Sequence, residues 1–206
     1  MLKSISNRLT QEGALHVLFV CTGNICRSPT AERLAEAYSA RLHLQHFKAA
    51  SAGTRAVIGH PIHRQAAEVL EDLGGNASKF SARQLSPKLV SDADLILAMA
   101  AHHRDKVLEL APHCFSRTFM LTEASRLVSQ CDAQVVDDLA GLRQELTSEH
   151  RPDIADPIGQ SAGMFAAVGE QIAELLVPVM ELLQRSAIAT VKADSVPSIP
   201  PQRAER

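Results

Sequence analysis

The segment "CTGNICRSP" at positions 21–29 places a thiol, a guanidinium and a hydroxyl within a few residues of each other. Cys21 directly follows the apolar run "ALHVLFV", and Arg27 precedes a segment in which apolar residues have helical spacing. A loop that leads from a strand into a helix turns backbone N–H groups toward one point, where the helix dipole also favours negative charge. We therefore expect this segment to bind an oxyanion of the size of phosphate.

Cys21 has the position of a nucleophile in such a loop. The positive field of the helix start and of Arg27 favours the thiolate, which is the reactive form of cysteine. Arg27 offers a planar fork of N–H donors that pairs two oxygens at once. Cys21 alone could be a buried apolar side chain, and Arg27 alone could form a surface ion pair. Neither explanation accounts for the spacing of the two residues. Together they indicate attack on a bound phosphorus atom.

The other loop residues support this chemistry. Gly23 and Asn24 tolerate the positive φ angles that such a loop needs. Ser28 is expected either to donate its hydroxyl to the thiolate or to cap the following helix. The predicted phosphate-binding loop also includes Thr22, Ile25 and Cys26.

Strands and helices that position this loop alternate along the chain. Four apolar runs are typical of buried strands, at 14–20, 47–53, 93–99 and 117–121. Helical spacing occurs at 28–42, 61–75, 101–112, 122–150 (with a polar interruption) and 163–187. This order predicts an α/β fold, a single doubly wound three-layer domain with a four-stranded parallel sheet. Pro178 predicts a kink in the last helix.

Composition excludes several classes of function. The formal net charge of −2 gives no basic face for nucleic acid. No run approaches the ~18 apolar residues of a membrane span, so we expect no membrane insertion and a cytoplasmic location. The four cysteines are too few for a disulfide scaffold, and none forms a Cys-x2-Cys zinc pair. Adjacent His102 and His103 point apart on a helix and no third ligand is evident, so we expect no metal. We expect no cofactor either.

We expect one domain over residues 13–187. The ends, 1–12 and 193–206, are predicted to be flexible, since the tail is polar and rich in Pro and Ser. Residues 126–151 form an extended segment to which the sequence assigns no role.

With these motifs in place, the chain resembles the low-molecular-weight protein tyrosine phosphatases. The likeness rests on "CTGNICRSP", "SAGT" at 51–54, "ARQL" at 82–85, "ADLILAM" at 93–99 and "DIADPIG" at 153–159. It implies that Cys21 forms a phosphocysteine, that Arg27 clamps the phosphate oxygens and that Asp156, before Pro157, is the general acid. Asn24 would hold the loop through hydrogen bonds to residues such as Ser51.

Other carboxylates near the predicted acid are expected to lie on the surface, namely Asp153, Asp137 and Asp138. The resemblance also implies reversible pairing of Cys26 with Cys21 under oxidation. The plainer interpretation of Cys26 is a buried apolar contact.

Two departures from the family leave the substrate open. Aromatic residues that wall the pocket in the tyrosine enzymes are missing from "DPIG" and "TRAVIGHP". Phe80 stands where many relatives have a histidine that supports the loop, so we expect an altered polar network there. Ile25 resembles the phosphotyrosine group, since some relatives that hydrolyse phosphoarginine have threonine at this position.

The sequence therefore predicts a cysteine-dependent phosphomonoester hydrolase, a tyrosine phosphatase acting on a phosphorylated protein through phosphocysteine. Alternatives are a phosphoarginine phosphatase, an arsenate reductase and a non-catalytic phosphate-binding regulatory module. Cys114 and Cys131 are badly spaced for the disulfide relay of a reductase. The sequence leaves the oligomeric state open.

Overall fold

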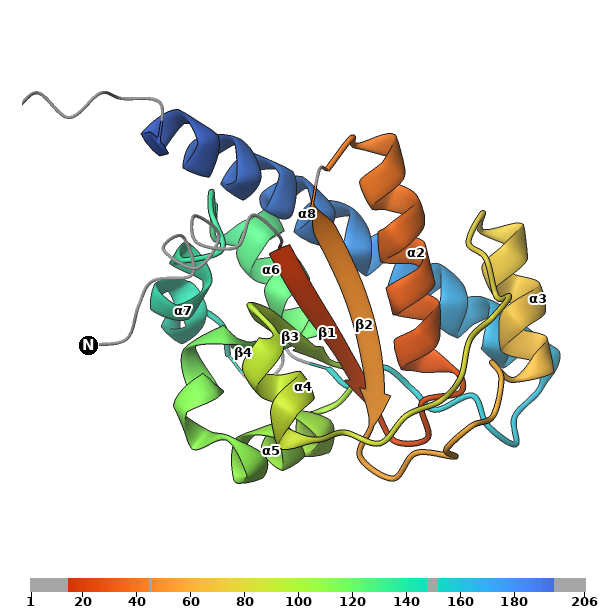
Figure 1. Cartoon of the computed structure of the whole chain (residues 1–206). Helices are drawn as coiled ribbons and strands as arrows, with labels where there is room; N and C mark the ends of the chain where they lie inside the picture. Colours follow the sequence, from red (N-terminus) through yellow and green to blue (C-terminus); the bar gives the residue numbers. More distant parts are fainter. Residues whose placement is uncertain (1–14, 45, 148–151, 195–206) are drawn as a thin grey trace, which may run out of the picture.

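The computed structural model describes residues 15–44, 46–147 and 152–194 (Figure 1). The strands are β1 (Leu15–Cys21), β2 (Phe47–Gly53), β3 (Leu95–Ala98) and β4 (Thr118–Met120). The α-helices are α2 (Arg27–Arg41), α3 (Arg64–Asp72), α4 (Pro87–Asp92), α5 (Ala101–Leu110), α6 (Leu121–Gln130), α7 (Asp138–Leu142) and α8 (Ala162–Asp194). The 3-10 helices are η1 (Pro112–Arg117) and η2 (Arg143–Glu145).

All strand pairs are parallel, and the order across the sheet is β2-β1-β3-β4. The predicted four-stranded parallel sheet is therefore confirmed. The chain passes from β1 to β2 on one side and later to β3 on the other side of β1, so the strand order reverses at β1. Ligands of such sheets bind beyond the carboxyl ends of the strands at this reversal. The loop after Cys21 lies there.

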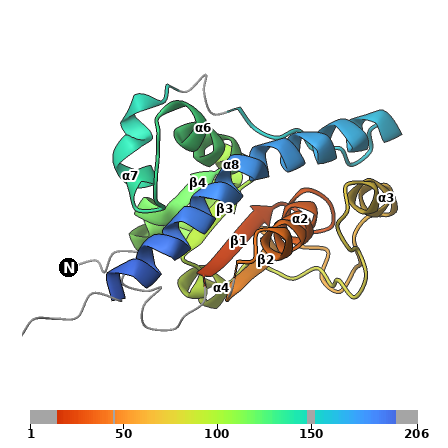
Figure 2. The same ribbon diagram turned by 90° about the horizontal axis from the view of Figure 1, so that it is seen from above.

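Helices cover both faces of the sheet (Figure 2). Side chains of β1 alternate between two apolar clusters. Val17 and Phe19 pack in the cluster that includes residues of α2, α6 and α8, whereas Leu18 and Val20 pack in the cluster that includes residues of α4 and α5. All four side chains are 1% exposed or less. Burial on both faces explains why the strand is a continuous apolar run.

The sequence analysis missed helix α4. Its six residues are too few to show helical periodicity. A capping signal was present, because the Ser86 hydroxyl accepts a hydrogen bond from the backbone N–H of Leu89 and Pro87 begins the helix.

The segment predicted to be helical at 122–150 forms α6, α7 and η2, with a break at 131–137. The predicted flexible end at 1–12 lies outside the described residues. Helix α8 runs to Asp194, two residues into the end predicted to be flexible, and 195–206 lie outside the described residues.

Helix α8 continues through Pro178. Its residues 162–188 are long and apolar enough to cross a membrane by length and composition alone, with a mean hydropathy of 1.3. However, 44% of the apolar window is buried inside the fold, and Ile172, Leu176 and Leu183 are fully buried in the core shared with α2 and α6. Core packing accounts for the buried part of this apolar composition, whereas Met164, Val177 and Ile188 of the same helix are exposed.

Candidate active site

The loop between β1 and α2 is a tight turn whose polar residues are mostly buried. Asn24 has a left-handed φ of 55°, as predicted, whereas Gly23 does not have a positive φ. Asn24, Arg27 and Ser28 are at most 4% exposed. Helix α2 begins at Arg27 with Cys26 as its N-cap, so the predicted capping role of Ser28 is wrong.

Ser28 is instead directed at the predicted nucleophile. The Cys21 Sγ lies 2.9 Å from the Ser28 Oγ. That oxygen accepts a hydrogen bond of 3.0 Å from the Asn24 side-chain amide, which leaves the serine proton free to be donated to the sulfur. The serine hydroxyl is therefore placed to donate a charge-assisted hydrogen bond to the sulfur whenever Cys21 carries a negative charge.

Asn24 connects the loop to the neighbouring strand, as predicted. Its amide nitrogen donates to the Ser51 Oγ at 2.7 Å, and its carbonyl oxygen accepts from the backbone N–H of Arg83 at 2.8 Å. The Arg83 guanidinium also donates to the Ser51 carbonyl oxygen at 2.7 Å. Each polar group of the Asn24 side chain thus has a partner, which fixes the left-handed turn.

Sequence reasoning missed Glu32, which ends this network. The Ser51 hydroxyl donates to the Glu32 carboxylate, which is 6% exposed. Burial raises the pKa of Glu32, and the hydrogen bond from Ser51 and the charges of Arg83 and Arg33 act in the opposite direction. Phe80 contributes no polar group: its ring packs against the core, and the Arg33 guanidinium lies 5.6 Å from its centroid.

His103 on α5 also contacts the loop, a role that the sequence analysis did not assign to it. Its Nε2 lies 2.8 Å from the Thr22 Oγ1, and the side chain is fully buried. Burial, together with the charges of His102 and Arg27, lowers the pKa of His103 to about 3. The imidazole is therefore neutral at physiological pH and braces the phosphate loop from the side.

This pKa makes folding stability depend on pH. Unfolded His103 titrates near 6.5 and folded His103 near 3, so the unfolded chain binds the extra proton between these values. The histidine therefore contributes stability above pH 6.5 that is lost as the pH falls toward 3, at up to about 1.4 kcal/mol per pH unit. Urea unfolding of wild type and His103→Gln at several pH values measures this effect. The free energy of unfolding should fall less in the variant than in wild type as the pH is lowered. Parallel curves would contradict this prediction.

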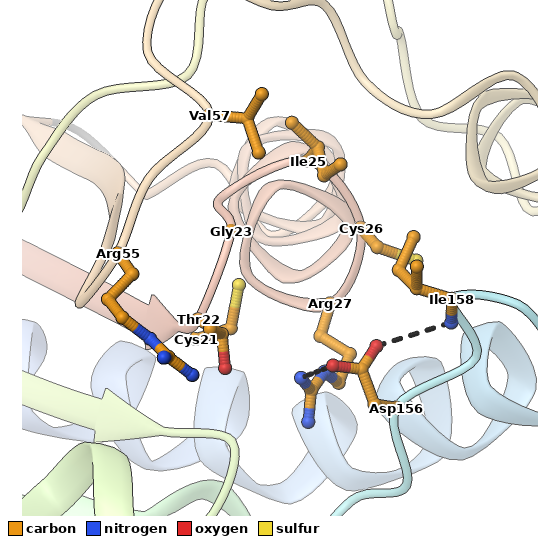
Figure 3. Close-up of a pocket in the computed structure, with 10 residues that line it drawn as sticks. All are labelled: Cys21, Thr22, Gly23, Ile25, Cys26, Arg27, Arg55, Val57, Asp156 and Ile158. Carbon is orange, nitrogen blue, oxygen red and sulfur yellow. Dashed lines mark hydrogen bonds and ion pairs between the residues drawn. The ribbon is translucent and has the colours of Figure 1, made fainter.

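Asp156 and Arg27 form an ion pair across the site. The Arg27 Nη2 lies 2.5 Å from the Asp156 Oδ2, and the Arg27 Nη1 donates to the carbonyl oxygen of Ile154 at 3.0 Å (Figure 3). The Asp156 side chain is 47% exposed, whereas Arg27 is buried. A backbone N–H of Ile158 donates to the Asp156 Oδ1 at 3.3 Å, and the adjacent Pro157 is buried. The structure thus brings the predicted acid to the predicted clamp.

Asp153 is exposed, as predicted, and it also has a structural role. Its Oδ1 accepts a hydrogen bond of 2.8 Å from the backbone N–H of Ala101, the first residue of α5. This N–H has no partner within the helix, so Asp153 supplies the missing acceptor. Together with the hydrogen bond from Ile154 N to the Met99 carbonyl, it anchors the segment that carries Asp156.

We expect Asp153→Ala to lower kcat for an aryl phosphate about three- to tenfold with little change in KM, because the acid loses its anchor while the phosphate loop stays intact. The lost cap should also destabilise the fold by about 1 kcal/mol. Steady-state kinetics and thermal unfolding measure the two effects. Asp153→Asn, which keeps an acceptor oxygen, is the control. A wild-type kcat in Asp153→Ala would refute the anchoring role.

These groups surround a pocket of about 410 Å³. Its lining residues are Cys21, Thr22, Gly23, Ile25, Cys26, Arg27, Arg55, Val57, Asp156 and Ile158. The hydrophobic walls are the aliphatic side chains of Ile25, Val57 and Ile158, and none of the lining residues is aromatic (Figure 3). This agrees with the expectation from the sequence.

The remaining thiols differ from Cys21 in environment. Burial and the nearby Cys21 and Asp156 raise the pKa of Cys26 to about 12, so this thiol stays protonated. Its pairing with Cys21 stays a prediction. Cys114 is fully buried in the cluster on the other face of the sheet. No group of three His, Cys, Asp or Glu side chains suited to a metal ion occurs among residues 15–44, 46–147 and 152–194.

Comparison with known proteins finds one matching family and relatives of two kinds. Residues 16–148 match the family described as "Low molecular weight phosphotyrosine protein phosphatase". The matched range ends before Asp156. The low molecular weight protein-tyrosine-phosphatase Etp of Escherichia coli K12 is 38% identical over 104 residues, which cover 50% of this chain and 67% of Etp.

A second group of relatives has a different stated substrate. The protein-arginine-phosphatase of Geobacillus stearothermophilus is 32% identical over 168 residues, 82% of this chain and 95% of the relative. The solved structure of a YwlE arginine phosphatase mutant with a phosphorylated active-site serine superposes with a TM-score of 0.67 at 25% identity, covering 82% of this chain and 96% of that one. The similarity extends to both tyrosine and arginine phosphatases.

Proposed function

Because the chain belongs to the low molecular weight phosphotyrosine protein phosphatase family, we propose that it hydrolyses phosphotyrosine in proteins with Cys21 as the nucleophile. The observation that supports this most directly is the convergence of Cys21, Arg27 and Asp156 on one pocket. Pure binding of phosphate would need neither a thiol nor a carboxylate.

In the first step the Cys21 sulfur attacks phosphorus, a P–S bond forms and the P–O bond to the tyrosine breaks. Arg27 and the backbone N–H groups at the start of α2 hold the phosphate oxygens. Protonated Asp156 gives its proton to the departing phenolic oxygen. The product is a phosphocysteine and a free tyrosine side chain.

In the second step the Asp156 carboxylate takes a proton from water, whose oxygen attacks phosphorus as the P–S bond breaks. Inorganic phosphate leaves and the thiolate is regenerated, with Ser28 donating a hydrogen bond to the sulfur as it becomes charged. The phosphorylated active-site serine in the YwlE mutant structure supports transfer of the phosphoryl group to the nucleophile's position.

The pocket walls favour phosphotyrosine over phosphoarginine. Ile25, Val57 and Ile158 offer apolar surface that suits a phenyl ring. The N–H groups of phosphoarginine would need acceptors, and Asp156 is the only carboxylate among the lining residues. Arsenate reduction is disfavoured because Cys114 lies beneath the opposite face of the sheet and has no access to Cys21.

Hydrolysis of matched phosphotyrosine, phosphoserine and phosphoarginine peptides tests this function. We expect the highest kcat/KM with phosphotyrosine. A higher value with phosphoarginine would establish the alternative, and inactivity on all three and on aryl phosphates would refute the enzyme. We also propose a cytoplasmic location, since a reducing compartment keeps the Cys21 thiol and the other three free cysteines reduced.

A further inference from the structure

Arg55 is the second guanidinium of the pocket, and the proposed mechanism does not use it. It lies on the loop after β2 and lines the pocket beside Cys21 and Thr22. In Figure 3 its side chain lies on one side of Cys21, while Asp156 and Ile158 lie on the other. Because Arg55 is exposed and lines the pocket, it lies where the pocket meets solvent, an edge that we call the rim.

The backbone holds Arg55 in place against the phosphate loop. Its N–H donates to the Thr22 carbonyl oxygen at 2.9 Å. The backbone N–H groups of Thr54 and Val57 donate, at the same distance, to the carbonyl oxygens of Cys21 and Gly23 respectively. Gly53 permits this close approach, because a Cβ there would lie 2.5 Å from the Thr22 carbonyl oxygen. The Arg55 backbone is thus fixed relative to the nucleophile, and only its exposed side chain is free to adjust.

The charge of Arg55 is not compensated inside the protein. The guanidinium forms no ion pair with any residue that the structure describes. Asp156 is the only carboxylate of the pocket, and it is paired with Arg27. A substrate phosphate is expected to replace Asp156 as the partner of Arg27, and Asp156, protonated as the acid of the first step, then offers no counter-charge to Arg55. Arg55 is therefore left as a cation at the rim.

We propose that Arg55 selects phosphotyrosine peptides in which a glutamate or aspartate lies next to the phosphorylated residue. This inference rests on the proposed phosphatase function and specifies its substrate class. The planar fork of arginine pairs a carboxylate through two parallel hydrogen bonds. The tyrosine ring lies against the aliphatic side chains, and the flanking peptide crosses the rim where the guanidinium is exposed.

Pairs of phosphotyrosine peptides that differ only in Glu or Gln at the two flanking positions test the proposal. For wild type we expect kcat/KM to be about three- to tenfold higher with the Glu peptide, the range of a partly exposed charge-assisted pair. In Arg55→Gln this ratio should fall to about 1, and Arg55→Lys should retain part of it. Raising the salt concentration should reduce the wild-type ratio.

Arg64→Gln is the matched control, since Arg64 is an exposed arginine of α3 outside the pocket lining. Its peptide ratio should equal that of wild type. Equal kcat/KM of wild type for the two peptides would overturn the proposal. An equal loss with both peptides in Arg55→Gln would also overturn it, because Arg55 would then act on the phosphate or the ring.

Failure of the phosphatase function is distinguishable from failure of this inference. Hydrolysis of p-nitrophenyl phosphate by wild type reports on the function alone. If no substrate is turned over, fluorescence anisotropy of the same two labelled peptides with wild type and Arg55→Gln measures the preference as a ratio of Kd values. A wild-type ratio of 1 in that experiment also refutes the role of Arg55.

Discussion

Replacing Cys21 by serine is expected to lower kcat for p-nitrophenyl phosphate by at least about 10⁴-fold, because a neutral hydroxyl is a far weaker nucleophile than a thiolate. The fold should be retained, since the two side chains have similar shapes and, within the part of the chain that the structure describes, the Cys21 side chain forms a hydrogen bond with Ser28 alone. Steady-state kinetics measure the loss, and thermal unfolding verifies the fold.

The matched control is Cys131→Ser, which changes a partly exposed thiol outside the pocket. It should keep wild-type kinetics. An acid quench of wild type during turnover of a ³²P-labelled substrate should also trap a phosphorylated protein, and Cys21→Ser should not reach the same rate of labelling. Full activity of Cys21→Ser would eliminate the proposed mechanism.

Replacing Asp156 by asparagine is expected to lower kcat for phosphotyrosine about 10²- to 10³-fold, because the leaving oxygen then departs without a proton. Asparagine keeps the size of the side chain and one oxygen toward Arg27, so binding should change little. The loss should be smaller with p-nitrophenyl phosphate, whose leaving group is more acidic and needs less protonation.

Comparison of kcat for a series of aryl phosphates with graded leaving groups measures this difference. The dependence on leaving-group acidity should be steeper in Asp156→Asn than in wild type. The acidic limb of the pH–rate profile should also change. If the variant lost activity equally with all leaving groups, Asp156 would serve only to hold Arg27, and another residue would have to act as the acid.

Much of the site could be predicted from the sequence because its central residues are contiguous. The types and spacing of Cys21, Asn24, Arg27 and Ser28 indicated both a phosphate-binding loop and a nucleophile within it. Asp156 lies far along the chain, and its link to the loop came from the resemblance rather than from spacing. The parallel sheet was predictable from apolar runs, each bounded by helical segments.

The residues that support the loop could not be predicted in the same way. Glu32 reaches it from α2, His103 from α5 and Arg83 from the segment between α3 and α4. Their contacts depend on how distant parts of the chain are placed side by side. Local patterns contain no information on such pairings. A glutamate on the apolar face of α2 was the one available signal, since a buried carboxylate needs a partner.

The contact between Arg27 and Asp156 joins residues 129 positions apart. Such a contact forms only after the intervening chain, with three of the four strands, has been organised, and contacts of this range are late and slow to form. During synthesis the thiol-bearing loop leaves the ribosome long before the carboxylate does. Catalytic competence should therefore appear only after the segment that carries Asp156 has been synthesised and folded, which would keep a shorter nascent chain from acting on phosphoproteins.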